Sequence, residues 1–200
     1  RRWSASDAEA YEEYSRLMFE MARFIKPILS IAPPDPTRLN PREWLPVAGL
    51  ARVDVLAIPG GESTTISKLA RSAGLVEPIV ERANAGMPIL GTCAGMIVMA
   101  ERVDGLEPLL SLVDITVRRN AYGRQVDSFE ADLDVEGVEH PVRGVFIRAP
   151  IVEEIGEGVR VLAEHEDRPV VLEQENLVVA SFHPELVGET GLHGYVLGKV

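Results

Sequence analysis

Two hundred residues, 46% of them hydrophobic, are enough for one domain with a full core. The net charge of −11 argues against nucleic acid and anionic membranes as partners, since both repel an acidic protein. A single cysteine excludes an internal disulfide and a cysteine-rich zinc site. Because the sequence shows neither a membrane-length apolar run nor the apolar core of a secretory signal, we expect a cytoplasmic protein.

The first 52 residues predict one helix and one short strand. After a capping box at residues 6–9, apolar side chains recur at helical spacing up to residue 25, which indicates an amphipathic helix. Residues 28–32 are consistent with a short strand. Five prolines in residues 33–46 then predict an extended surface loop.

The next fifty residues alternate between strands and helices. We predict strands at 53–58 and from residue 89, the second leading directly to a cysteine. The first predicted helix follows residues 59–65 and ends near residue 73. The second spans 76–85, and the third runs from the cysteine to about residue 102. This order is typical of a parallel sheet covered by helices.

The second half predicts mainly strands. Strict alternation of apolar and acidic residues over 129–136 indicates a strand with one solvated face, as in antiparallel pairing. Other expected strands are 112–117, 142–147, 159–164, 169–173 and 177–182, and a closing helix is expected at 191–200. With no repeat or low-complexity segment, we interpret residues 1–200 as one domain.

Cys93 stands between a predicted strand and a predicted helix, with glycines two residues away on each side. Flanking glycines permit the strained turn that presents a nucleophile at the top of a sheet. A helix N-terminus there also favours the thiolate. The alternative is a buried structural cysteine.

A cysteine nucleophile needs a base, and the chain offers four histidines. His183 directly follows an apolar strand, and sites form at the ends of parallel strands. The other three are less suitable: His140 and His165 lie in charged stretches near predicted strand ends or turns, and His193 lies on the expected surface of the last helix.

Glu185 is placed to orient the imidazole of His183 across Pro184, which stiffens the connection. Cys93, His183 and Glu185 therefore form a candidate catalytic triad. The alternative is that residues 183–185 are only a turn after a strand.

A second candidate is the loop of Gly60, Gly61, Glu62 and Ser63. Two glycines at a helix start can direct N–H groups toward an oxyanion or a carboxylate. The loop lacks the lysine and spacing of a P-loop. Glu62 suits an ammonium or an amide instead of an anion, and a simple tight turn is the alternative.

Together these motifs resemble the class I (triad) glutamine amidotransferases, and within them the glutaminase subunits of pyridoxal 5′-phosphate synthase. The resemblance covers residues 52–198. It is carried by residues 59–65 (PGGESTT), 91–95 (GTCAG), 119–125 (RNAYGRQ), 146–150 (FIRAP) and 181–185 (SFHPE).

The resemblance implies an α/β fold: a three-layer, flavodoxin-like mixed sheet, mostly parallel with antiparallel additions, and helices on both faces. It implies hydrolysis of L-glutamine to glutamate and ammonia through a thioester on Cys93, with His183 shuttling protons and Glu185 holding His183. Backbone N–H groups of Ala94 and of Gly60 or Gly61 would stabilise the oxyanion.

By motif, the resemblance also implies the residues that contact glutamine. They are Gly61, Glu62, Ser63, Arg119, Ile147 and Arg148. An arginine would hold the α-carboxylate, and Glu62 would meet the α-ammonium. Residue type alone does not distinguish Arg119 and Arg148 from ordinary surface ion-pair residues.

Ammonia would pass to a separate synthase subunit with a (β/α)₈ barrel, which makes the vitamin B6 cofactor. The glutaminase is expected to be poorly active alone and to switch on when docked. The resemblance implies no metal and no organic cofactor, and neither nucleic acid nor membrane as a partner.

The N-terminal 52 residues depart from this family. Its members open with a strand similar to Ile-Gly-Val-Leu-Ala-Leu-Gln-Gly, and nothing similar stands in residues 1–52. Helix 6–25 and strand 28–32 would then be the family's first helix and second strand. We therefore expect a truncated or replaced first strand, which would affect partner docking more than the triad.

Three other functions are compatible with these motifs. The first is a glutaminase subunit serving another synthase, which residues 62–65 and 119–125 argue against. The second is a non-catalytic binding or regulatory module, which the intact triad opposes. The third is a cysteine peptidase, although the Gly-Gly-Glu-Ser loop suits a free amino acid better.

Overall fold

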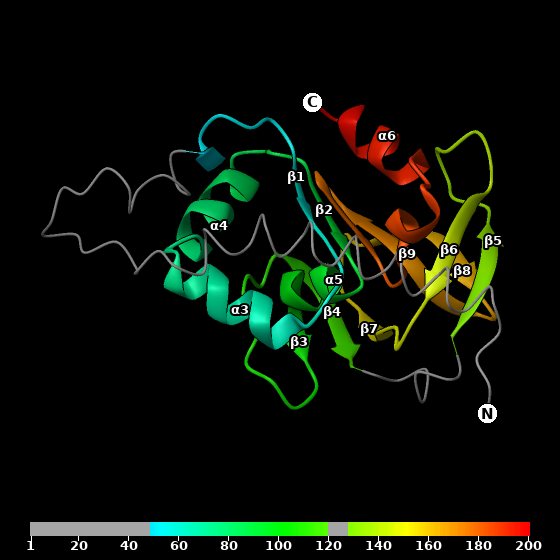
Figure 1. Ribbon diagram of the computed structural model, residues 1–200, viewed down its shortest axis with the longest axis horizontal. Helices are drawn as coiled ribbons and strands as arrows, with labels where there is room; N and C mark the ends of the chain where they lie inside the picture. Colours follow the sequence, from blue (N-terminus) through cyan, green and yellow to red (C-terminus); the bar gives the residue numbers. More distant parts are fainter. Residues whose placement is uncertain (1–48, 120–127) are drawn as a thin grey trace, which may run out of the picture.

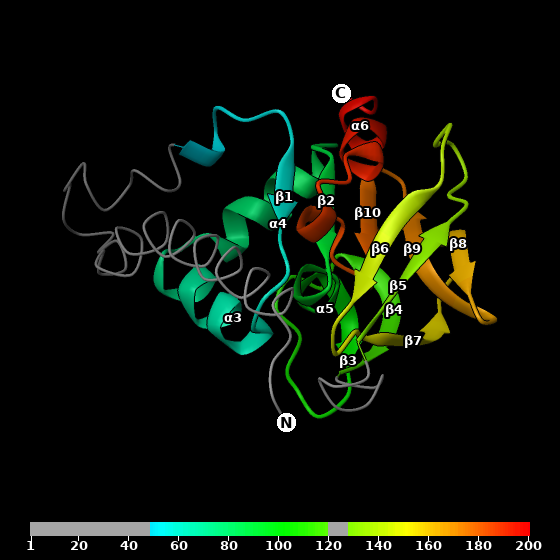
Figure 2. The same ribbon diagram turned by 45° about the vertical axis from the view of Figure 1, so that its right-hand side comes forward.

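A five-stranded sheet organises the part of the chain that the computed structural model describes, residues 49–119 and 128–200. Its strands lie in the order β1-β2-β10-β9-β8 (Figures 1 and 2). Their bounds are β1 Leu56–Ile58, β2 Ile89–Thr92, β8 Arg160–His165, β9 Arg168–Gln174 and β10 Leu177–Ala180. Strands β1, β2 and β10 are parallel, whereas β10, β9 and β8 are antiparallel neighbours.

Two smaller sheets accompany the large one. Strands β3 (Ala100–Val103), β4 (Val113–Arg118) and β7 (Ile151–Ile155) form one, and the antiparallel pair β5 (Phe129–Leu133) and β6 (Val142–Phe146) forms the other. The strand predicted over 129–136 is confirmed over residues 129–133 as β5, whose partner β6 runs antiparallel to it.

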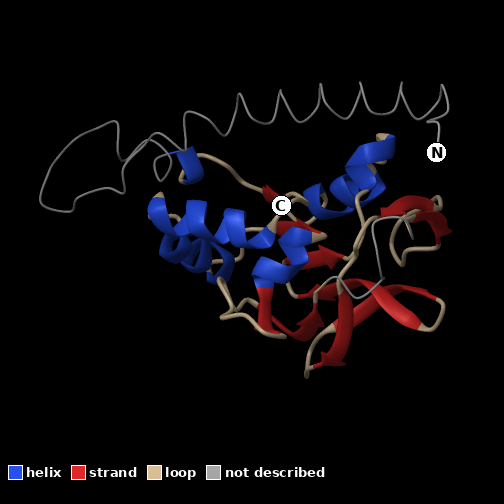
Figure 3. Cartoon of the chain, turned by 60° about the horizontal axis from the view of Figure 1, so that its bottom comes forward, coloured by secondary structure: helices blue, strands red, loops and turns tan. Residues whose placement is uncertain are grey.

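Helices lie in two groups on different sides of the strands (Figure 3). They are α3 Ser63–Ser72, α4 Val76–Asn84, α5 Ala94–Met99 and α6 Gly191–Leu197, with a short 3₁₀ turn, η2, at Pro184–Val187. Helices α4 and α5 pack on one face of the large sheet, while α6 packs on the other. The expected α/β fold with helices on both faces is therefore confirmed.

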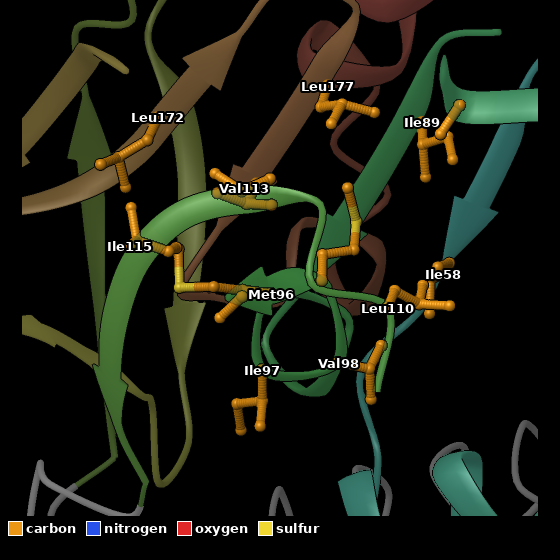
Figure 4. Close-up of a cluster of buried hydrophobic side chains, with 14 of the residues drawn as sticks. Ile58, Ile89, Met96, Ile97, Val98, Leu110, Val113, Ile115, Leu172 and Leu177 are labelled. Atoms are coloured by element: carbon orange, nitrogen blue, oxygen red, sulfur yellow. The ribbon is translucent and has the colours of Figure 1, made fainter. Parts of the chain in front are cut away.

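The alternation of side chains along the strands divides the core between these two faces. Ile89 of β2 packs in the cluster with α4 and α5, whereas its neighbour Leu90 packs in the cluster with α6. Figure 4 shows the first cluster, where side chains of α5 and β4 meet those of β2, β9 and β10. Burying each large apolar side chain stabilises the fold by about 1.5–3 kcal/mol, so both layers hold the sheet rigidly.

Several predicted element boundaries were wrong, and strands 129–136 and 177–182 and helix 191–200 end early, at Leu133, Ala180 and Leu197. The helix after Cys93 ends at Met99, not near residue 102, because Ala100 adopts extended backbone (φ −63°, ψ 143°) and starts β3 beside β4. The first strand begins at Leu56, not residue 53, because the N–H groups of Arg52 and Val53 donate to the carbonyls of Gly49 and Leu50 in a turn. Strand β7 was not predicted.

The predicted helix 6–25 and strand 28–32 lie outside the described residues. Among residues 49–119 and 128–200, β1 has only β2 as a strand neighbour, so its outer edge is unpaired there. A truncated or replaced first strand, and one domain over residues 1–200, stay predictions. No helix in the described part is long and apolar enough to cross a membrane.

Candidate active site

Three strand ends define the candidate site. Thr92, the last residue of β2, pairs with Ala180, the last residue of β10, and β1 ends at Ile58 beside Gly91. Because these strands are parallel, the residues that follow them emerge at one edge of the sheet, where α/β proteins bind ligands. The following residues are the loop from Pro59, the nucleophile candidate Cys93, and the His183 segment.

Cys93 lies on a strained turn between β2 and α5. Its backbone has φ 47° and ψ −101°, a conformation uncommon for a residue with a side chain. Its N–H donates to the carbonyl of Ala180 at 2.8 Å, which ties the turn to β10. The residue is 6% exposed. The predicted strand–nucleophile–helix turn is thus present, although the helix has only six residues.

Gly95 allows this turn to pack tightly against β1. A Cβ added there would lie 2.1 Å from the carbonyl oxygen of Ile58, so no other residue fits without displacing α5 or β1. Gly95, two residues after the cysteine, therefore lets the nucleophile turn lie close to β1, the strand that leads into the Gly60 loop.

His183 and Glu185 form the hydrogen-bonded pair that the sequence predicts. His183 Nδ1 lies 2.9 Å from Glu185 Oε1, and the two side chains are 14% and 32% exposed. The N–H of His183 donates to the carbonyl of Val145 at 2.8 Å, so strand β6 anchors the histidine backbone. His183 is therefore held by hydrogen bonds at both its backbone N–H and its ring Nδ1.

Electrostatics in this pair favour an imidazolium beside a carboxylate. Burial disfavours the charged ring, but interactions with the side chains of Cys93 and Glu185 outweigh it and raise the pKa of His183 to about 10. Burial also acts to raise the pKa of Glu185, but the hydrogen bond from His183 and the charges of His183 and His193 lower it overall. Such opposed shifts are typical of acid–base pairs in active sites.

Glu62 has a role that the sequence did not predict, as the N-cap of α3. Its carboxylate accepts hydrogen bonds from Thr64 N at 3.1 Å, Thr65 N at 2.6 Å and Thr65 Oγ1 at 2.8 Å. Although burial acts to raise it, these bonds lower the pKa of Glu62 to about 2. Arg119, in the turn after β4, places Nη2 3.5 Å from Glu62 Oε1. The structure thus brings these two predicted site residues together.

The remaining predicted contacts lie around the same edge. Gly61 has φ 138°, which favours glycine, and Ser63 buries a hydroxyl that has no hydrogen-bond partner among the described residues. Ile147 is half-buried, and Arg148 is exposed with φ 48°. Both follow β6, close in sequence to the Val145–His183 bridge. Residues 120–125 of the predicted motif lie outside the described residues.

The other three histidines are not members of the candidate triad. His165 stacks on Phe129 and Phe146, with ring centroids 5.1 and 5.6 Å apart, and His140 lies 3.8 Å from Glu189. His193, predicted to lie on the surface, is half-buried, and its Nδ1 has no hydrogen-bond partner in the described part of the chain. Within residues 49–119 and 128–200, no group of His, Cys, Asp and Glu side chains could hold a metal ion.

Comparisons with known proteins identify the family of this chain. The family model of the SNO glutamine amidotransferases matches residues 45–200. A protein of Niallia circulans named pyridoxal 5′-phosphate synthase subunit PdxT is 51% identical over 152 residues, covering 76% of this chain and 80% of its own length. The protein of that name from Pyrococcus horikoshii is 52% identical over 155 residues, covering 76% and 79%.

Solved structures show the same relationship. One described as a glutamine amidotransferase has a TM-score of 0.73 and 46% identity, and covers 76% of this chain and 82% of its own. A Thermoplasma acidophilum protein described as part of a GMP synthase, 13% identical with a TM-score of 0.54 over 78% of this chain and 77% of its own, shares the fold alone. This chain belongs to the SNO glutamine amidotransferase family.

Proposed function

We propose that this protein hydrolyses L-glutamine to L-glutamate and ammonia, with Cys93, His183 and Glu185 as its catalytic triad. The observation that carries the proposal is the His183–Glu185 pair, 2.9 Å apart, at the same sheet edge as a cysteine on a strained turn. Family membership and the names of relatives support glutamine as the substrate.

In the first half-reaction, the thiolate of Cys93 attacks the side-chain amide carbon of glutamine. Ala94 is the first residue of α5, so its N–H has no acceptor within the helix and can stabilise the oxyanion. A backbone N–H of Gly60 or Gly61 provides the second donor. The imidazolium of His183 then protonates the leaving ammonia, which leaves a thioester on Cys93.

In the second half-reaction, water attacks the thioester. His183, now neutral, accepts a proton from the water, and Glu185 stabilises the imidazolium that forms again. The thiolate of Cys93 leaves, and glutamate is released. Since Nδ1 is engaged with Glu185, Nε2 is the nitrogen that exchanges protons with substrate and water.

Gly61, Glu62, Ser63, Arg119, Ile147 and Arg148 bind the glutamine. Arg148 suits the α-carboxylate, because it is exposed and has no ion pair among the described residues. The Glu62 side chain is 55% exposed although it caps α3, so it can still accept from the α-ammonium. Arg119 also contacts the Glu62 carboxylate, with Nη2 3.5 Å from Oε1.

Ammonia passes to a synthase subunit with a (β/α)₈ barrel, in the cytoplasm. Relatives about 50% identical to this chain are named as subunits of pyridoxal 5′-phosphate synthase, which supports this partner and its product. Docking of the barrel raises the glutaminase activity, as we expect for this family.

A glutamine analogue with a diazoketone in place of the amide tests this function, because a thiolate nucleophile attacks it irreversibly. We expect the analogue to label Cys93, and an excess of glutamine to protect it, as read by peptide mass spectrometry. Labelling at surface positions only, or labelling that glutamine does not slow, would contradict the proposal.

A further inference from the structure

Gly60 lies against the imidazole of His183. A Cβ added to Gly60 would lie 2.1 Å from Cε1, 2.4 Å from Nδ1 and 3.2 Å from Nε2 of that ring. All three distances are closer than ordinary van der Waals contact. The next residue differs, since a Cβ on Gly61 would meet nothing within 4 Å. The ring therefore occupies the space that a side chain at position 60 would need.

Hydrogen bonds oppose a movement of the imidazole away from Gly60. Its Nδ1 bonds to Glu185 Oε1, and its backbone N–H bonds to Val145, so a shift of the ring breaks or stretches a contact of the triad. The preceding residue, Phe182, is fully buried and packs against Phe146 with ring centroids 5.3 Å apart. The chain on the histidine side is thus fixed by packing as well as by hydrogen bonds.

Packing also opposes a retreat of Gly60. It is buried and lies two residues after Ile58, whose carbonyl oxygen is in close contact with the backbone of Gly95 in α5. The end of β1 is therefore enclosed between the nucleophile helix on one side and the histidine ring on the other.

We propose that Gly60 is a positioning residue. Because it has no Cβ, the imidazole of His183 can lie in the position between Cys93 and Glu185. This role is separate from donation of an N–H to the oxyanion, because an alanine at position 60 keeps that N–H and adds only a methyl group. The inference rests on the proposed function for its effect on turnover. The steric contact itself does not depend on any reaction.

The first test compares Gly60→Ala with Gly194→Ala in the full chain together with its synthase subunit. Gly194 is the matched control, because a Cβ there meets nothing within 4 Å. A displacement of the base by about 1 Å costs on the order of 10²-fold in rate. We expect kcat for glutamate release to fall by about that factor in Gly60→Ala with little change in KM, and to stay unchanged in Gly194→Ala.

The second test measures the rate at which iodoacetamide alkylates Cys93, as a function of pH. In the wild type, the imidazole of His183 supports the thiolate of Cys93, which is the form that iodoacetamide alkylates. We expect the profile of Gly60→Ala to move toward that of His183→Ala. A fall in kcat with an unchanged alkylation profile would show that Gly60 acts on the oxyanion alone, and would overturn the proposal.

A double-mutant cycle that measures the free energy of unfolding covers the case in which Gly60→Ala folds poorly. If the methyl group clashes with the imidazole, the loss of stability caused by Gly60→Ala disappears in the His183→Ala background. An equal loss in both backgrounds would overturn the proposal. If wild type releases no glutamate, the proposed function fails, while the alkylation profile and this cycle still decide the positioning role.

Discussion

His183 Nδ1 lies 2.9 Å from Glu185 Oε1, and the carboxylate and imidazole are only two residues apart in the chain. Strand β6 holds the backbone of His183, and Pro184 begins the η2 turn that carries Glu185. The pair is therefore set by local chain geometry, and its orientation toward Cys93 is set by the parallel pairing of β2 with β10. Changes to either residue should alter both turnover and stability.

Replacing Glu185 with glutamine removes the charge that supports the imidazolium and leaves an amide that can select the wrong tautomer. We expect kcat for glutamate release to fall by about 10²-fold or more. Glu189→Gln is the control, because Glu189 belongs to the same segment but bonds to the N–H groups of Gly191 and Arg143. Equal rates in both variants would contradict a catalytic role for Glu185.

The raised pKa of His183 makes stability depend on pH. A pKa of about 10 in the folded protein, against about 6.5 when unfolded, gives a contribution that is complete below pH 6.5 and is lost as pH rises through 10. Between pH 6.5 and 8, the free energy of unfolding should therefore fall by roughly 1 kcal/mol per pH unit more in wild type than in His183→Gln. Urea denaturation curves of both proteins at the two pH values measure this difference. An equal change in the free energy of unfolding with pH in both proteins would contradict it.

The lowered pKa of Glu185 gives the opposite dependence. This contribution is present above the ordinary glutamate pKa of 4.5 and is lost as pH falls through the lower folded value. We expect wild type to lose more stability than Glu185→Gln on acidification below pH 4.5. Acid titration followed by circular dichroism distinguishes the two, and superimposable curves would show that Glu185 is not ionised in the folded protein.

Glu62→Ala removes the N-cap of α3. We expect the free energy of unfolding to drop by about 1 kcal/mol, the usual cost of losing a helix cap, and KM for glutamine to rise. Glu81→Ala, an exposed glutamate on α4, should change stability by no more than about 0.5 kcal/mol and leave KM unchanged. Unchanged stability in Glu62→Ala would show that the carboxylate does not cap the helix.

Gly95→Ala places a methyl group against the carbonyl oxygen of Ile58, which lies 2.1 Å from the added Cβ. Overpacking of this kind costs about 1–3 kcal/mol, and it also displaces the Cys93 turn. We expect lower stability together with lower kcat. Gly194→Ala should be neutral or slightly stabilising, because alanine is the better helix former. If both substitutions have the same effect, α5 and β1 are not in close contact.

The candidate triad could be proposed from sequence because each member has a local signal. Cys93 is the only cysteine and has glycines on both sides, and His183 follows an apolar strand with a carboxylate two residues later. The structure places all three at one sheet edge, where parallel strands end together. Arg119 and Arg148 have no such signal, and only their resemblance to family motifs distinguished them from other basic residues.

Other features could not be predicted because tertiary contacts decide them. Helix α5 is buried on every side, so hydrophobic periodicity gave no sign that it ends at Met99 and continues into β3. Glutamate is an unusual N-cap, and the Ser and Thr residues after Glu62 are more common at that position. The contact between Gly60 and His183 joins residues 123 positions apart, and nothing local in either segment indicates it.

The most direct test of the account is glutamate release from L-glutamine, measured with and without the barrel synthase subunit in wild type and Cys93→Ala. We expect wild type to release glutamate at a rate that rises when the synthase is present, and Cys93→Ala to release none under either condition. No release by wild type with the synthase would contradict the glutaminase function, and release by Cys93→Ala at the wild-type rate would contradict the thioester mechanism.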